Sequence, residues 1–107
     1  MGKIVVQYIP EVENYLDNLI EILFYKEYFG FIESANNYVD RIIDFIDFNI
    51  AKIPSKISPK QLLNLGSKYI LYKANSTTTW YIFFEKSDDR YLVTFITNNH
   101  SEFAGYF

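Results

Sequence analysis

The fold is decided by residues 80–100, which read WYIFFEKSDDRYLVTFITNNH. Two runs rich in aromatic and β-branched residues flank the polar stretch 86–90, and this pattern predicts a β-hairpin with a short loop. The second strand of this hairpin runs straight into His100, the only histidine of the chain. The last third of the chain is therefore expected to form the centre of a β-sheet.

The segments before the hairpin predict two further strands. Residues 68–74, KYILYKA, follow a turn marked by Gly66, and the polar residues 75–79 connect them to the hairpin. The last three strands are therefore predicted to form an antiparallel meander. Residues 3–8, KIVVQY, predict one short strand at the start of the chain.

Two amphipathic helices are predicted between the first strand and the meander. Apolar side chains recur at helical spacing over residues 10–28 and again over residues 32–52. Pro10 stands where the first helix would begin, Gly30 would interrupt the pattern, and Pro54 would end the second helix. Because only a few residues join the helices, we expect them to pack antiparallel as a helical hairpin.

These elements give the order β-α-α-β-β-β and a single α+β domain over residues 1–107, with the helical hairpin on one face of a small, mainly antiparallel sheet. Ser58 and Pro59 resemble an N-cap followed by proline, which predicts a single helical turn through Leu63. The C-terminal residues 102–107 end on aromatics. They are expected either to fold back over the core or to present apolar surface to a partner.

Composition excludes several kinds of site. The 107 residues include no cysteine and one histidine, so a disulfide framework and a thiolate metal site are excluded and a histidine-based metal centre is not expected. Aromatic residues make up 20% of the chain, which predicts a core built on rings. No apolar run approaches the length of a membrane span, and no signal peptide is evident. We therefore expect a soluble cytoplasmic protein without metal or cofactor.

The net charge of −3 hides an uneven distribution. No acidic residue lies between Asp47 and Glu85, and this gap holds five lysines, at positions 52, 56, 60, 68 and 73. One interpretation is an electrostatic footprint for phosphate or for an acidic partner. The other is a solvated loop followed by an edge strand that its lysines protect.

The order of these pieces resembles the RelE/ParE superfamily of toxins from bacterial type II toxin–antitoxin, or plasmid-stabilisation, pairs. The matching features are the opening strand followed by Pro10 and Glu11, the two-helix hairpin, and Gly66 before a basic strand. The aromatic run 80–85 resembles the family's tyrosine-arginine-aliphatic-x-tyrosine-glutamate segment. The last strand resembles one that closes on a histidine or arginine in relatives.

The resemblance implies one of two activities. One group of relatives cleaves messenger RNA on the ribosome without a metal, and the other inhibits DNA gyrase. Both groups are silenced by a cognate antitoxin protein, and a homodimer is left open for this chain. Tyr81 stands where the ribonuclease relatives carry arginine, and Phe84 stands where they carry tyrosine. Together with a sequence pI near 5.0, these departures motivate an alternative, a non-catalytic protein-interaction module that keeps the toxin fold.

Six residues are candidates for chemistry if the protein cleaves RNA. Metal-free cleavage needs a base, an acid and cations around the scissile phosphate. His100, Tyr81 and Glu85 are the catalytic candidates, because histidine exchanges protons near neutral pH and the other two share one face of a strand. His100 is expected beside the face carrying Lys68, Lys73 and Tyr81.

The phosphate-binding candidates are Lys68, Lys73 and Arg90. The alternative for His100 is an exposed side chain at a strand end, and tyrosines in so aromatic a chain can serve packing alone. Asp88 and Asp89 are assigned to the hairpin turn and not to a metal.

Overall fold

The computed structural model describes residues 3–25 and 32–106, and its elements follow the predicted order with one addition. The strands are β1 (Val5–Tyr8), β2 (Lys56–Ile57), β3 (Lys68–Lys73), β4 (Thr79–Ser87) and β5 (Arg90–Asn98). The helices are α1 (Pro10–Tyr25) and α2 (Ile32–Asn49), and two short 3₁₀ turns are η1 (Lys60–Leu62) and η2 (Glu102–Tyr106). Strand β2 is the addition, and the α+β class is confirmed.

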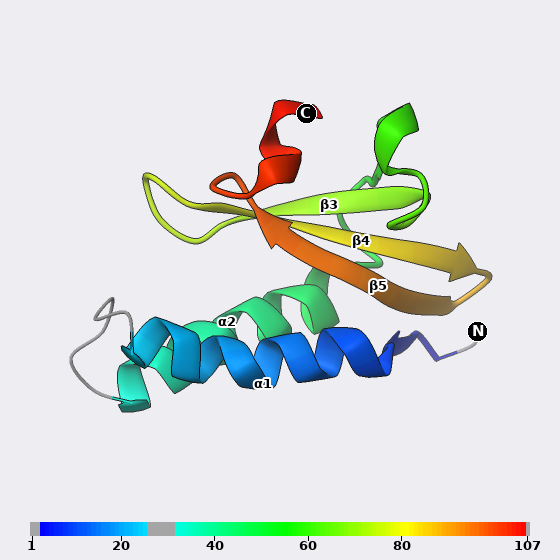
Figure 1. The fold of residues 1–107 in the computed structure, drawn as a ribbon. Helices are drawn as coiled ribbons and strands as arrows, with labels where there is room; N and C mark the ends of the chain where they lie inside the picture. Colours follow the sequence, from blue (N-terminus) through cyan, green and yellow to red (C-terminus); the bar gives the residue numbers. More distant parts are fainter. Residues whose placement is uncertain (1–2, 26–31, 107) are drawn as a thin grey trace.

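The sheet has five strands in the order β1-β5-β4-β3-β2. Strands β3, β4 and β5 form the predicted antiparallel meander, whereas β1 runs parallel to β5. The two helices lie side by side and antiparallel, and they cover one face of the sheet, as predicted (Figure 1). Both short turns, η1 and η2, lie on the opposite face (Figure 1). The helices therefore cover one sheet face, and the two short turns lie over part of the other.

Helix α2 ends three residues before the predicted position. Asn49 is its last residue, and the Asn49 Nδ2 group donates a hydrogen bond to the Phe45 carbonyl at 3.0 Å. Ile50 is buried although it lies beyond the helix, so the apolar pattern continues past the true end. The predicted end of the first helix near residue 28 and its interruption at Gly30 lie outside the described residues.

The proposed cap at Ser58 is wrong. Pro59 is the residue before η1, and no side chain caps this turn. The Ser58 hydroxyl instead donates a 2.6 Å hydrogen bond to the Gly66 carbonyl, so it ties the segment before η1 to the segment after it. The Ser58 side chain therefore bonds across the loop to Gly66 and does not cap the turn that follows it.

Alternation along β4 divides its side chains between the two faces. Trp80, Ile82 and Phe84 belong to the core cluster beneath the helices, with Val12, Leu16 and Leu19 of α1 and Val39, Ile42 and Ile46 of α2. The Trp80 indole N–H donates a 2.9 Å hydrogen bond to the Tyr38 hydroxyl, so its one polar group is satisfied. Trp80 is therefore a structural residue of the core.

A β-bulge separates the two halves of the β4–β5 hairpin. Phe83 pairs with Phe95, but Phe84 pairs with Val93, which leaves Thr94 as the extra residue. The Thr94 hydroxyl donates a 2.5 Å hydrogen bond to the Leu65 carbonyl, and Gly66 lies against the bulge. The hairpin closes through Asp88 and Asp89, with Asp88 in the left-handed region at φ 54°, so the assignment of this pair to the turn is confirmed.

Tyr8 links β1 to α2 through a hydrogen bond that its hydroxyl donates, so the bond requires the phenol to stay protonated. The Tyr8 hydroxyl donates to Asp47 Oδ1 at 2.7 Å. Burial raises the pKa of Tyr8, and the Asp47 carboxylate raises it further. Burial raises the pKa of Tyr15 and of Tyr38 in the same direction.

These pKa shifts predict a loss of stability in alkaline solution. A raised phenol pKa means that the unfolded chain loses its proton first, at about pH 10, so unfolding becomes more favourable as the pH rises above that value. We expect the urea midpoint to fall steeply between pH 9 and pH 11. Tyr8→Phe should be less stable by about 1 kcal/mol at pH 8 but lose less on going to pH 11. Parallel pH profiles for the two proteins would contradict this role of Tyr8.

Candidate functional site

A row of aromatic rings crosses the sheet face that the helices leave uncovered. Ring centroids lie 6.3 Å apart for Tyr69 and Tyr81, 5.6 Å for Tyr69 and Phe83, and 6.2 Å for Phe83 and Phe95. Phe103 of η2 continues the row, 5.4 Å from Phe95. Strand alternation places Tyr69, Tyr81, Phe83 and Phe95 on this face; Phe83 is fully buried at 0% exposed, and the other rings are partly exposed. We call these five residues the aromatic row.

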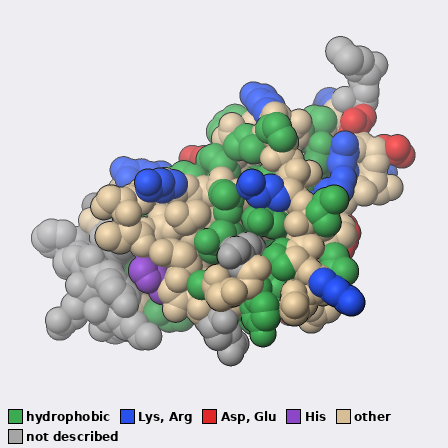
Figure 2. All heavy atoms as spheres, turned by 90° about the horizontal axis from the view of Figure 1, so that it is seen from above, with side chains coloured by type: hydrophobic (Ala, Val, Ile, Leu, Met, Phe, Trp, Pro, Cys, Tyr) green, Lys and Arg blue, Asp and Glu red, His purple; other side chains and the backbone are tan. Residues whose placement is uncertain are grey.

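Apolar and basic side chains surround the aromatic row. Leu71 of β3 pairs with Tyr81 and is 37% exposed. Leu63 beside η1 and Tyr106 of η2 are also exposed. Figure 2, viewed onto this side, shows hydrophobic side chains across the middle with Lys or Arg side chains at several points around them. The aromatic row together with Leu71, Leu63 and Tyr106 makes up what we call the sheet surface.

Of the predicted site residues, Tyr81, Glu85 and Lys73 lie on this face of the sheet. Tyr81 and Glu85 both lie on the strand face directed away from the helices, as the strand period predicts. Lys73 shares the face of Tyr69 and Leu71 because it follows them at intervals of two along β3. Tyr81 and Glu85 nevertheless lie four positions apart on β4, about 13 Å at 3.3 Å per residue. The two side chains are therefore not placed to act on one atom.

Glu85 already has hydrogen-bond partners within the protein. Its carboxylate accepts one hydrogen bond from the Ser67 amide at 3.0 Å and another from the Ser67 hydroxyl. The pair fastens the start of β3 to β4 beside Gly66. Sequence reasoning missed Ser67, because its contact with Glu85 depends on the β3–β4 register and not on a local motif. A carboxylate held this way is suited to structure more than to proton transfer.

His100 lies just beyond the C-terminal end of β5, an interior strand of the sheet. Its backbone N–H donates to Asn98 Oδ1 at 2.9 Å, and His100 Nε2 lies 3.2 Å from the Thr78 hydroxyl. The neighbouring Asn99 accepts a hydrogen bond from the Thr79 amide and donates one to the Thr77 carbonyl. The Asn98–His100 segment, whose asparagines were not predicted to matter, therefore holds the β3–β4 loop.

A cavity of about 760 Å³ opens beside His100, on the helix side of the sheet end. Tyr15 and Leu19 of α1, Tyr38 of α2 and Trp80 of β4 line it together with His100. His100 therefore borders a space between sheet and helices, and Tyr81 and Glu85 do not line it. The structure does not bring the three proposed catalytic residues together.

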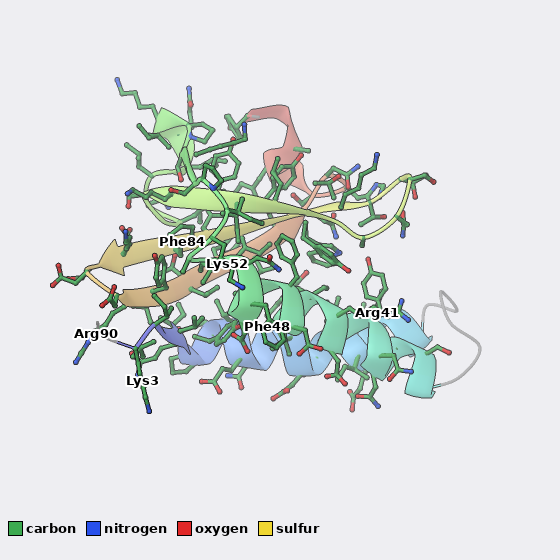
Figure 3. All side chains as sticks on the ribbon, turned by 180° about the vertical axis from the view of Figure 1, so that it is seen from behind. Lys3, Arg41, Phe48, Lys52, Phe84 and Arg90 are labelled. Carbon is green, nitrogen blue, oxygen red and sulfur yellow. The ribbon has the colours of Figure 1, made fainter. Side chains whose placement is uncertain are left out.

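The three proposed phosphate-binding residues are also dispersed. Lys68 and Lys73 lie five positions apart on β3, so they occupy opposite faces of the strand. Lys68 pairs with Phe84, which faces the helices, so the expectation that Lys68 shares a face with Lys73 and Tyr81 is wrong. Arg90 begins β5, and the full nine-residue strand separates it from the segment of His100. Figure 3 shows Arg90 at the same end of the molecule as Lys3.

The described residues contain no group of three or more His, Cys, Asp or Glu side chains that could hold a metal ion. In the same part of the chain, no helix has the length and apolar character needed to cross a membrane. Comparisons with protein-family models, with curated proteins and with solved structures found no match. The functional argument therefore rests on the geometry of the molecule.

Proposed function

We propose that this protein is the toxin component of a type II toxin–antitoxin pair, a RelE/ParE-type toxin or a diverged member of that fold, and that it acts by binding. The observation that carries the proposal is the sheet surface, where a row of rings and exposed apolar side chains faces away from the helices. Aromatic anchors in the middle of a patch with a polar rim are typical of protein interfaces. The sheet surface is proposed to bind the antitoxin.

The charge around the sheet surface supports an acidic partner segment. Lys56 lies on the edge strand β2, Lys60 in η1 and Lys73 at the end of β3, and all three are exposed. No acidic residue occurs between Asp47 and Glu85 to neutralise them within that stretch. Complementary charge would speed the encounter and fix the orientation of an acidic antitoxin segment.

Binding is favoured over RNA cleavage because the catalytic candidates His100, Tyr81 and Glu85 do not converge. Cleavage without a metal needs a base, an acid and cations around one phosphate. Here Glu85 is held by Ser67, and His100 borders a cavity that neither Tyr81 nor Glu85 lines. Of the two activities that the resemblance implies, inhibition of DNA gyrase needs no such set. We propose gyrase as the target before the ribosome and its messenger RNA.

The proposal is tested by inducing this gene alone and together with each neighbouring small open reading frame. We expect induction to arrest growth, co-expression of the cognate antitoxin to restore it, and purified protein to inhibit supercoiling by gyrase. Messenger RNA should stay intact on ribosomes. His100→Ala should keep inhibition within about threefold, whereas a lost general acid or base costs about 10²-fold or more. Unchanged growth and supercoiling would contradict the proposal, and an RNA cleavage activity that His100→Ala abolishes would overturn the binding mode.

Leu71→Glu is the sharpest test of the sheet surface. It places a negative charge among the exposed apolar side chains near Tyr81, in the region proposed to receive an acidic partner. We expect the Kd for the antitoxin, measured by calorimetry, to rise by at least about thirtyfold, the size of a central interface residue. Phe48→Glu is the matched control, because Phe48 is 68% exposed on α2 and not part of the sheet. Equal losses in both variants would place the interface elsewhere.

A non-catalytic interaction module that keeps the toxin fold is the second candidate. Phe84, which stands where ribonuclease relatives carry tyrosine, is 1% exposed beneath the helices and so cannot reach a substrate. This candidate predicts specific binding of the neighbouring gene product without growth arrest and without gyrase inhibition. Growth arrest that is relieved by the same partner would exclude it.

A further inference from the structure

A second hollow, of about 250 Å³, lies on the helix side of the sheet and is distinct from the cavity beside His100. Residues 50–55, which follow α2, form one side of it. Phe84 and Tyr91 contribute the aromatic part of its lining, and their ring centroids lie 5.8 Å apart. Figure 3 shows Lys52 next to Phe84 at this place. The hollow thus lies between the segment that follows α2 and the sheet.

Three lysines from three separate segments meet at this hollow. Lys68 opens β3 and pairs with Phe84, and Lys86 lies near the end of β4 and pairs with Tyr91. Because Phe84 and Tyr91 face the helices, their partners in register face the same way. Lys86 Nζ lies 5.6 Å from the centroid of the Tyr91 ring. Lys52 comes from the segment after α2 and lines the hollow from the other side.

Among the described residues, the three lysines at the hollow are not held in ion pairs, although Glu85 precedes Lys86 and Asp88 and Asp89 follow it in sequence. The nearest acidic residue before Lys52 in sequence is Asp47, which accepts the Tyr8 hydroxyl, and residues 48–84 contain no acid. Three like charges that border one small space repel each other unless an anion occupies it. A compact anion with more than one negative charge would offset the repulsion among the three lysines.

We propose that the hollow bordered by Lys52, Lys68 and Lys86 binds a phosphate dianion, either free inorganic phosphate or the terminal group of a phosphomonoester. Three ammonium groups match a dianion better than the single charge of a phosphodiester within nucleic acid. Ser55 is also among the residues that line the hollow, and serine hydroxyls donate to phosphate oxygens. The site lies on the opposite face of the sheet from the aromatic row, so it does not depend on the proposed function.

Calorimetry and amide NMR titrations with small probes test the site. Inorganic phosphate and methyl phosphate are expected to bind saturably, with shifts at residues 50–55, Lys68, Lys86 and Tyr91. Dimethyl phosphate, which carries one charge, should bind at least tenfold more weakly. Tighter binding of methyl phosphate assigns the site to a monoester, and tighter binding of inorganic phosphate assigns it to the free ion. Absence of saturation, or equal binding of dimethyl phosphate, would overturn the proposal.

Single lysine variants separate a built site from general positive charge. Lys68→Met is expected to weaken methyl phosphate binding about tenfold or more, and Lys86→Met to do the same. Lys73→Met is the matched control, because Lys73 ends the same strand on the other face, and its effect should stay within twofold. Equal weakening by all three would overturn the proposal.

Thermal melting of Lys52→Met tests a purely structural role for the lysine at this hollow. Lys52 follows α2 closely enough to offset the partial negative charge of the helix end. If that is its whole role, Lys52→Met lowers the melting temperature and leaves phosphate binding unchanged, which would remove Lys52 from the site. We expect binding to weaken about tenfold, and phosphate to raise the melting temperature of the wild type more than that of the variant.

Discussion

Replacing Trp80 by alanine is expected to lower the free energy of unfolding by about 3–5 kcal/mol. Trp80 is 2% exposed and belongs to the core cluster shared by the sheet and both helices. Its ring meets that of Tyr38 edge to face at 6.4 Å, and its indole N–H is bonded to the Tyr38 hydroxyl. Truncation would leave a void at the sheet end and remove this bond. Urea unfolding followed by far-UV circular dichroism measures the loss.

Two variants show where the loss comes from. Trp80→Phe keeps a ring in the core but removes the hydrogen bond to Tyr38, so it should cost less than Trp80→Ala, and it remains measurable if Trp80→Ala does not fold. Phe48→Ala removes an exposed aromatic side chain from α2 and should change stability by no more than about 0.5 kcal/mol. A Trp80→Ala loss below about 1 kcal/mol would contradict the central position of Trp80 in the core.

Gly66→Ala is expected to cost about 2–3 kcal/mol, because the position has no room for a side chain. A Cβ atom there would lie 2.7 Å from Thr94 Oγ1, 2.9 Å from Phe83 Cβ and 3.0 Å from the Phe84 backbone nitrogen. The last two atoms belong to the central strand and cannot turn aside. The same substitution threatens the Thr94 hydrogen bond to Leu65, which anchors the bulge. Denaturant midpoints at constant m-value measure the effect.

Gly105→Ala is the matched control for Gly66→Ala. A Cβ atom at Gly105 would meet nothing within 4 Å, so the change should lie within about 0.5 kcal/mol of the wild type. If Gly66→Ala were as mild as Gly105→Ala, the close approach of the residue 66 backbone to β4 would be wrong.

Elements with strong internal periodicity could be predicted from the sequence. The alternation in residues 80–98 and the helical spacing of Val12, Leu16 and Leu19 depend only on neighbours along the chain, and both are confirmed. Strand β2 was missed because its two residues are defined only by pairing with Lys68 and Tyr69. Gly66 was predicted to mark a turn. Its packing against the bulge depends on where β4 and β5 pair, which the local sequence does not determine.

The candidate site was less predictable than the fold. Lys68 and Lys73 were grouped by charge, although a period of two puts positions five apart on opposite faces, and β-pairing then decides which face is which. Glu85 could be placed on its strand face, but its capture by Ser67 depends on two segments meeting. For His100, the end of a strand was predicted, whereas the contact with Thr78 depends on how the β3–β4 loop folds back.

The parallel pairing of β1 with β5 has a consequence for synthesis on the ribosome. Val5 pairs with Arg90, so β1 cannot pair with β5 until residues 85 positions later have been translated. At 5–20 residues per second this delay is about 4–17 s. During that time the helical hairpin can form, but its apolar side stays exposed because the sheet that it packs against is not complete. The nascent chain is therefore most exposed to chaperones and proteases just before β5 emerges, and chains interrupted before that point would lack the strand that joins the two ends of the sheet.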